Sequence, residues 1–157
     1  MKKIFVVALT VLIFGCSAYQ PPKDYNIIKE LIVEKSFDDT WAKVIEWFSS
    51  QGTPIKNMDK NSGFISTEYS LNAEQSNCLD CGKAGSAGLL GRQSITNPTG
   101  NFNVLIKKID NNRTKVTVNC FFKAVSRIQV MRETSENVLD CKSTGILEKK
   151  ILDFISQ

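Results

Sequence analysis

The sequence predicts an α+β domain, in which one antiparallel sheet carries two helices packed on one face, in the order β-α-β-β-β-β-α. Three observations predict this class. Two segments carry apolar residues at helical spacing, several segments alternate apolar and polar residues as strands do, and turn-forming residues separate neighbouring strand segments. An arrangement of this kind needs only one core.

The first predicted strand lies at residues 27–37, where β-branched residues are frequent and partly alternate. The pattern does not decide which of the two faces of the strand is buried. Either Ile28 and Ile32 or Leu31 and Val33 would point into the domain.

The first predicted helix begins after Ser36, a residue type that caps helices, and carries acidic residues in its first turn. Gly52 is placed to end the helix. One apolar face has residues spaced by three, four and seven positions. Its members are Trp41, Val44, Ile45 and Phe48. This spacing favours packing against a sheet over an aromatic binding site.

Two hairpins are predicted in the middle of the chain. In the first, a turn at 59–63 joins two short extended runs, and one face of the second run holds Ile65, Thr67, Tyr69 and Leu71. In the second, a turn at 110–113 leads into a strand whose core face holds Val116, Val118, Cys120 and Phe122. Whether this strand continues through 126–133 or restarts there is left open.

The chain is expected to close on a helix whose sequence is "STGILEKKILDFISQ". Its apolar stripe consists of Leu147, Ile151, Phe154 and Ile155. The opposite, polar face consists of Glu148, Lys149, Lys150 and Asp153.

The N-terminal residues 1–15 are typical of an export signal, with Lys2 and Lys3 before an apolar run. The run, residues 4–14, is shorter than the roughly 20 residues that a membrane-spanning helix needs. It ends at "IFGC", which resembles the bacterial lipobox. The resemblance implies that Cys16 is diacylated and becomes the first mature residue, and the alternative is an ordinary signal peptide that contains a cysteine.

Lipidation would anchor the mature protein to a membrane, because two or three acyl chains bind a bilayer stably. Ser17 stands where lipoproteins of the inner membrane commonly carry Asp, so the same resemblance implies the outer membrane. Residues 16–26, with Pro21 and Pro22, favour a flexible tether. We therefore expect one periplasmic domain at 27–157.

The charge of the mature chain is small. The signal carries two of the twenty basic residues, which leaves eighteen against sixteen acidic ones. Domains that bind nucleic acid usually concentrate a much larger basic excess on one face. We expect no nucleic-acid partner.

Three stretches carry a resemblance to a known family: "SFDDTWAKVIEWFSSQG", "IKNMDKNSGFISTEY" and "CKSTGILEKKILDFI". Together they resemble the helix-grip domains of bacterial outer-membrane lipoproteins, including those of a lipoprotein component of the β-barrel assembly machinery. The resemblance covers about half of the mature chain. It implies a fold and leaves the function open.

Four cysteines remain besides Cys16, and an even number in an exported protein suggests disulfides. We favour a Cys120–Cys141 bridge, because Cys120 points to the predicted core face and Cys141 precedes the closing helix. This leaves a short Cys78–Cys81 ring. A bridge from Cys78 or Cys81 to one of the other two cysteines is the competing arrangement.

The "CLDC" motif at 78–81 has two further interpretations. A C-x-x-C pair at a helix N-terminus can be a redox centre, but the glycines that follow disfavour a helix. Zinc is weakly supported, because the sequence has no second C-x-x-C and no histidine. We therefore predict no catalytic residue, no metal and no cofactor.

Two classes of function follow. In the first, the protein is a non-enzymatic adaptor that offers an exposed sheet edge or the long loop at 72–100 to an envelope protein. In the second, a small apolar ligand binds between the C-terminal helix and the sheet. The aromatic residues look sufficient to fill the core, which favours the adaptor. They are Trp41, Trp47, Phe48, Phe122 and Phe154.

Overall fold

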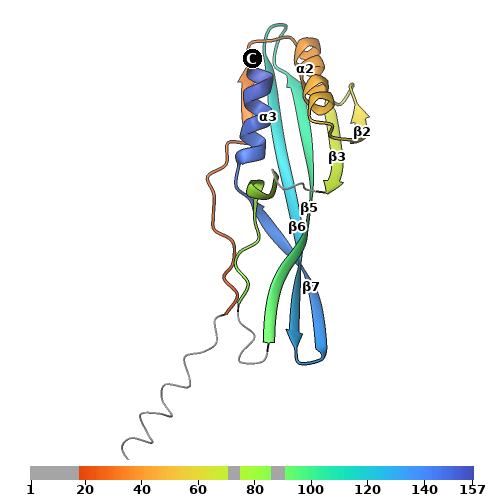
Figure 1. Cartoon of the computed structure of the whole chain (residues 1–157). Helices are drawn as coiled ribbons and strands as arrows, with labels where there is room; N and C mark the ends of the chain where they lie inside the picture. The colour runs from red at the N-terminus through yellow and green to blue at the C-terminus, as the bar shows by residue number, and fades with distance from the viewer. Residues whose placement is uncertain (1–17, 71–74, 86–90) are drawn as a thin grey trace, which may run out of the picture.

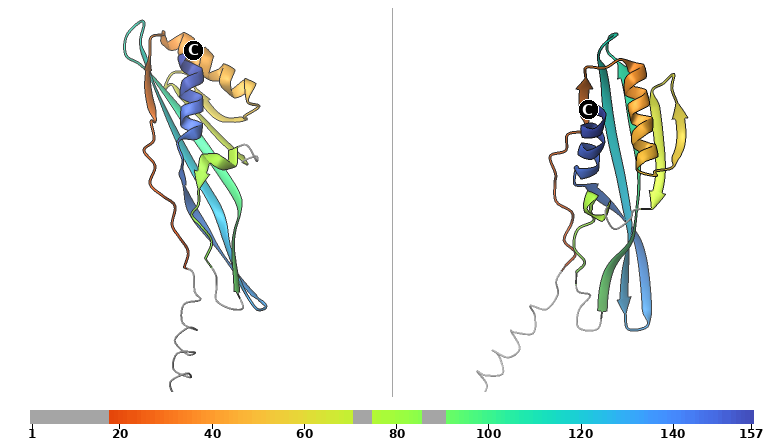
Figure 2. Two further views of the ribbon diagram at one scale, coloured as in Figure 1. Left: turned by 60° about the vertical axis from the view of Figure 1, so that its left-hand side comes forward. Right: turned by 45° about the horizontal axis from the view of Figure 1, so that its top comes forward.

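The computed structural model describes residues 18–70, 75–85 and 91–157. It confirms the predicted class: a seven-stranded antiparallel sheet carries two helices on one face (Figures 1 and 2). In chain order the elements are β1 (Glu30–Val33), α2 (Phe37–Ser50), β2 (Ile55–Asp59), β3 (Phe64–Ser70), a short 3-10 helix (Gln75–Cys78), β4 (Leu79–Asp80), β5 (Gly91–Lys108), β6 (Thr114–Val130), β7 (Glu133–Ser143) and α3 (Ile146–Ser156).

The sheet has the strand order β2-β3-β5-β6-β7-β4, and β1 pairs with the beginning of β6. Because β7 pairs only with the second half of β6, the sheet has two parts. In the upper part of Figure 1, the helices cover the strands. In the lower part, β5, β6 and β7 continue as a twisted three-stranded ribbon.

The helix α2 forms as its sequence predicts. The Ser36 hydroxyl accepts a hydrogen bond from the backbone N–H of Asp39 at 3.2 Å, which confirms the cap. Beyond the helix, Gly52 has a left-handed φ of 60°. The predicted apolar face is buried, with Trp47 in addition. Ile45, at the margin of this face, is only partly buried.

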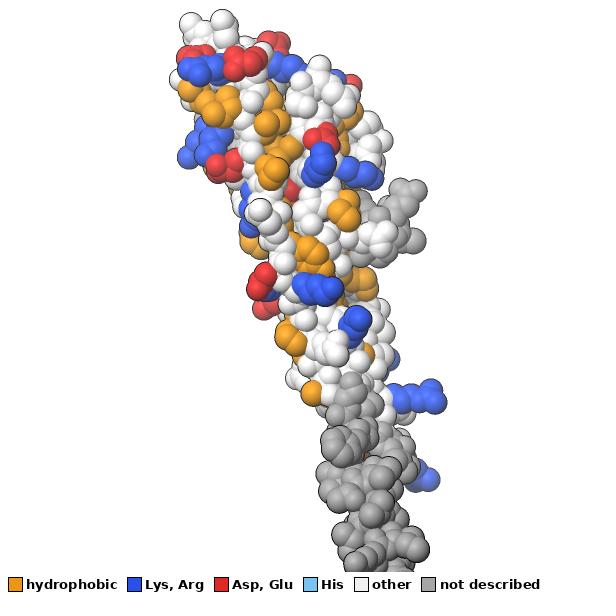
Figure 3. All heavy atoms as spheres, turned by 90° about the vertical axis from the view of Figure 1, so that its left-hand side faces the viewer, with side chains coloured by type: hydrophobic (Ala, Val, Ile, Leu, Met, Phe, Trp, Pro, Cys, Tyr) orange, Lys and Arg blue, Asp and Glu red, His pale blue; other side chains and the backbone are white. Residues whose placement is uncertain are grey.

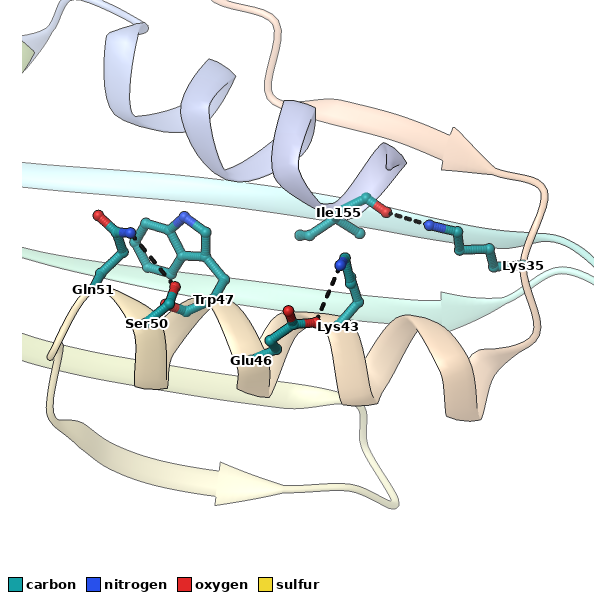
Figure 4. A network of polar contacts seen from close by, with 7 residues as sticks. All are labelled: Lys35, Lys43, Glu46, Trp47, Ser50, Gln51 and Ile155. Carbon is teal, nitrogen blue, oxygen red and sulfur yellow. Dashed lines mark hydrogen bonds and ion pairs between the residues drawn. The ribbon is translucent and has the colours of Figure 1, made fainter.

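The core lies between the helices and the sheet. Phe48 of α2 stacks on Phe102 of β5 with ring centroids 5.4 Å apart, and Trp47 packs edge-on against both rings. At the other end of the layer, the Lys35 ammonium donates a hydrogen bond to the carbonyl of Ile155 at 3.1 Å (Figure 4). This contact ties the end of α3 to the chain that follows β1.

The hairpins also follow the alternation. Gly63 ends the first turn with a φ of 69°, and a Cβ there would lie 2.0 Å from the carbonyl oxygen of Ile106. Only glycine fits this turn. Ile65 and Thr67, which were expected to share one face of this strand, are both buried, and Leu71, expected on the same face, lies outside the described residues. The core face of β6 is likewise buried at Val116, Val118 and Phe122, while Cys120 is partly exposed.

Three strand predictions need correction. The strand β1 is shorter than 27–37, and Leu31 and Val33 face inward while Ile28 and Ile32 face water. The predicted loop at 72–100 ends early, because β5 begins at Gly91. The second half of β6 continues to Val130 and returns as β7, so the sheet has two strands more than expected, β4 and β7.

The closing helix α3 confirms the apolar stripe, with Leu147, Ile151 and Ile155 buried and Phe154 partly buried. One residue of the predicted polar face is misplaced. Glu148 is 0 % exposed. It lies in the first turn of α3 and accepts a hydrogen bond from the hydroxyl of Ser143, the last residue of β7.

Candidate functional site

The disulfide joins Cys81 to Cys141, so the favoured pairing of Cys120 with Cys141 and Cys78 with Cys81 is wrong. The competing arrangement, a bridge from the "CLDC" motif to a distant cysteine, is the one observed. Its cause is the pairing of β4 with β7, in which Asp80 lies opposite Lys142. The next residue pair in this register is the two bridged cysteines. We call residues 79–83 the stapled loop.

Two further cysteines in the described part of the chain are free: Cys78, which is buried, and Cys120, which is partly buried. Burial raises the pKa of both thiols, and the nearby carboxylate of Glu148 raises the pKa of Cys120 further. A thiolate is therefore disfavoured at both positions. Because Cys78 is also not bonded to Cys81, the geometry argues against thiol redox chemistry at the motif.

A buried carboxylate lies beside these thiols. Oε2 of Glu148 accepts a hydrogen bond from the Ser143 hydroxyl at 2.8 Å, and that hydroxyl accepts one from the backbone N–H of Gly145 at 3.1 Å. Oε1 of Glu148 has no partner of normal geometry among the described residues. The first turn of a helix favours a negative charge. Glutamate three residues after the N-cap Gly145 is the sequence signal that marks this position.

The chain before the domain is hydrogen-bonded to the stapled loop. The phenol of Tyr19 donates to the carbonyl of Cys81 at 2.8 Å. Gln20 and Lys83 exchange both backbone hydrogen bonds, at 3.1 and 2.9 Å. A Cβ on Gly82 would lie 2.1 Å from the carbonyl oxygen of Gln20, so this close approach requires glycine. We call residues 19–25 the N-terminal strap.

Asp80 holds the upper part of the strap. One carboxylate oxygen accepts hydrogen bonds from the backbone N–H of Lys23 at 3.0 Å and from the phenol of Tyr25 at 2.8 Å. The other oxygen accepts from the N–H of Gly82 at 2.8 Å. These backbone hydrogen bonds lower the pKa of Asp80, and the hydrogen bond to Asp80 raises the pKa of Tyr25. The domain contacts therefore begin at Tyr19, before the expected start near residue 27.

A groove of about 370 Å³ lies where the strap ends, between residues 26–31 and α3. Its walls are mainly the apolar side chains of Ile27, Ile28, Leu31, Ile146 and Leu152. The Ile28 side chain is 72 % exposed. Figure 3, which looks onto this side of the molecule, shows apolar side chains scattered among charged ones along it. The charged pair Lys149 and Asp153, 2.6 Å apart, lies at the edge of the groove.

The side chains beneath the groove are buried. Ile151 and Ile155 of α3 are fully buried against the sheet, and so are Phe48 of α2 and Phe102 of β5. Among the described residues, no cluster of side chains could hold a metal ion, and no helix is long and apolar enough to cross a membrane. The predicted lipidation site, Cys16, and the signal at 1–15 lie outside the described residues.

Comparison with protein-family models finds no match to this chain, and comparison with curated protein sequences finds none either. The similarity to helix-grip lipoproteins therefore stays a prediction from three sequence stretches. The disulfide, the strap and the groove are the features from which a function can be argued.

Proposed function

We propose that this protein is a lipoprotein of the outer membrane, anchored through Cys16, and that it acts in the periplasm as a non-enzymatic adaptor for another envelope protein. The observation that carries the proposal is the N-terminal strap. The residues that follow Cys16 are hydrogen-bonded to the stapled loop, which a disulfide holds on β7.

The strap would hold the domain within a short distance of the lipid on Cys16. Tyr19 is three residues beyond Cys16, and Cα atoms three positions apart are separated by at most about 11 Å. The Tyr19 end of the domain would thus stay beside the membrane. A fixed position of this kind suits a protein that presents a surface to a partner. Of the flexible tether expected at 16–26, residues 19–25 are the ones that hydrogen bonds hold on the domain.

The groove beside α3 supplies the surface that we assign to the partner. It lies at the far end of the strap from the anchor, at residues 26–31, and its apolar walls include the exposed side chains of Ile28 and Ile146. Exposed apolar residues gathered in a groove are typical of binding sites for other molecules.

The anchor is tested by metabolic labelling with a fatty-acid analogue. The wild type should carry the label and Cys16→Ala should not. Cys81→Ser is the matched control, because it also removes one cysteine and should stay labelled. Equal labelling of the wild type and Cys16→Ala, or no labelling of either, would contradict the anchor.

The adaptor surface is tested by photo-crosslinking in intact cells. A photoreactive residue at Ile28 should give one defined protein adduct, which disappears in the Cys16→Ala background. The same residue at Met58, 56 % exposed on β2, is the control and should give none. Identical adducts from the two positions would mean random contact and would contradict the assignment of the groove.

A small apolar ligand is the second candidate, favoured by the volume of the groove and its apolar walls. This ligand would lie outside the filled core, against α3 and residues 26–31. Native mass spectrometry of protein purified from membranes tests it. A bound species present in the wild type and absent from Ile146→Arg, at an exposed position in the groove wall, would favour the ligand over the adaptor.

A further inference from the structure

The turn between β6 and β7 lies at the same end of the molecule as the start of the strap. In the three views of Figures 1 and 2, the ribbon extends along the long axis beyond the point where the described chain begins, at the opposite end from α2. A membrane to which Cys16 is attached would therefore face the turn. We call Val130, Met131 and Arg132 the ribbon tip.

The ribbon tip has an unusual conformation for its sequence. Met131 has a φ of 53°, a left-handed value that favours glycine or asparagine. Among the described residues, the only other non-glycine residue with a positive φ is Asn97. Side-chain packing in the turn does not compensate for the cost of this backbone conformation, because Met131 is 71 % exposed and Val130 beside it is exposed as well. The turn holds two apolar side chains in water at the outermost point of the ribbon.

Basic residues surround the ribbon tip. Arg132 lies in the turn, and Arg92 of β5 lies opposite Gln129, one residue before Val130. Both arginines are exposed. The acidic residue next to them is Glu133, the first residue of β7. Arginine binds phosphate groups through parallel hydrogen bonds, while apolar side chains beside it enter the interface of a bilayer.

We propose that the ribbon tip binds the surface of an anionic phospholipid membrane and forms a second attachment beside the lipid anchor. Met131 and Val130 enter the interface, and Arg132 and Arg92 contact lipid phosphates. The inference rests on the proposed anchor at Cys16, because that anchor brings this end of the molecule to the bilayer. A single lipid attachment lets a domain turn freely, whereas a second contact fixes its orientation and holds the groove away from the membrane.

The test uses the full-length lipidated protein in vesicles of phosphatidylethanolamine and phosphatidylglycerol. Met131→Trp places a fluorophore at the ribbon tip, and Met58→Trp places one on β2 at the far end of the sheet. The native residues Trp41 and Trp47 are buried and give a constant background. Lipids brominated on their acyl chains should quench the added emission of Met131→Trp and leave that of Met58→Trp unchanged.

Charge reversal separates the arginine contacts from the apolar ones. Adding Arg92→Glu and Arg132→Glu to Met131→Trp should reduce the quenching, and so should vesicles made only of phosphatidylcholine. Equal quenching of Met131→Trp and Met58→Trp in lipidated protein would overturn the proposal. The same holds if a photoreactive residue at position 131 crosslinks to a protein while Met131→Trp shows no quenching.

A failure of the proposed Cys16 anchor can be distinguished from a failure of the ribbon-tip proposal. If the fatty-acid label is absent from the wild type, the anchor is wrong, and unlipidated protein is added to the same vesicles. Quenching of Met131→Trp by brominated lipid in that mixture would still support the ribbon tip as a membrane contact. Absence of quenching there would overturn both proposals.

Discussion

The helix-covered part of the sheet and the ribbon use the same two strands in different ways. In the covered part, β5 and β6 turn one face to the helices, and Val104, Ile106 and Val118 are almost fully buried. In the ribbon beyond Phe122, the buried side chains among the described residues of these two strands are small ones near its root, Ala124 and Ser126. Burial of apolar surface stabilises the first region, whereas backbone pairing and the disulfide stabilise the second.

The two regions therefore differ in which residues can be substituted without loss of the fold. The covered part depends on close packing, so its large side chains are sensitive to truncation. The ribbon carries exposed residues such as Val138, 68 % exposed, and an exposed ion pair between Arg127 and Glu136. Such residues contribute little to stability and are available for contacts with a membrane or a protein.

The largest effect is expected in the covered part. Phe48→Ala should lower the free energy of unfolding by about 3–5 kcal/mol, because the ring leaves a cavity beside Phe102. Val138→Ala in the ribbon should change it by less than about 0.5 kcal/mol. Denaturant titration measures both. Similar losses for the two variants would remove the distinction between the regions.

The disulfide is the next largest contribution. It joins residues 60 positions apart, which the chain-entropy model values at about 4 kcal/mol. The double variant Cys81→Ser with Cys141→Ser should lose roughly that amount in unfolding experiments, and reduction of the wild type should reproduce the loss. A variant as stable as the wild type would show that β4 and β7 hold the stapled loop without the bridge.

The buried carboxylate at the root of the ribbon gives a smaller effect. Ser143→Ala removes the hydrogen bond that Oε2 of Glu148 accepts, which should cost about 1–3 kcal/mol. Glu148→Gln added to Ser143→Ala should restore part of the loss, because a neutral amide is less costly to bury without that hydrogen bond. Denaturant titration of the single and double variants measures both changes. If the Ser143→Ala protein were as stable as the wild type, the Glu148 carboxylate would have to be hydrated and not buried.

The smallest and most local effect concerns the strap. Asp80→Ala should speed trypsin cleavage after Lys23, and Asp110→Ala, which removes a similarly bonded aspartate from another turn, should not. The pKa of Asp80 is lowered in the folded protein, so its contribution is present above its ordinary pKa of about 3.9 and is lost as the pH falls through the lowered value. The part of the strap that Asp80 holds should therefore loosen as the pH falls through that lowered value, which an acid-stable protease would detect as new cleavage near residues 23–25.

The sequence alone predicts the covered part well, because each element there has one dry face. The helical spacing in α2 and the alternation in β6 report that face directly. The ribbon lacks such a face. In β5, "TNPTG" at 96–100 contains turn-forming residues and indicates a loop, yet pairing with β6 keeps it in the sheet, with a register shift between Thr96 and Thr99.

The candidate site was harder to predict. The disulfide pairing depends on β4, which has two residues and gives no periodic signal. The strap depends on hydrogen bonds between Tyr19, Gln20 and a loop some sixty residues away. Such contacts are set by the tertiary structure, and a Pro-rich segment looks like a free tether until its partner is known.

Peptide mapping of the protein under non-reducing conditions is the decisive measurement, because the place of the stapled loop and of the strap on β7 depends on one bridge. We expect a single peptide pair that joins Cys81 to Cys141. A bridge between Cys78 and Cys81, or between Cys120 and Cys141, would contradict it, because the loop that carries the strap would then not be fixed on β7.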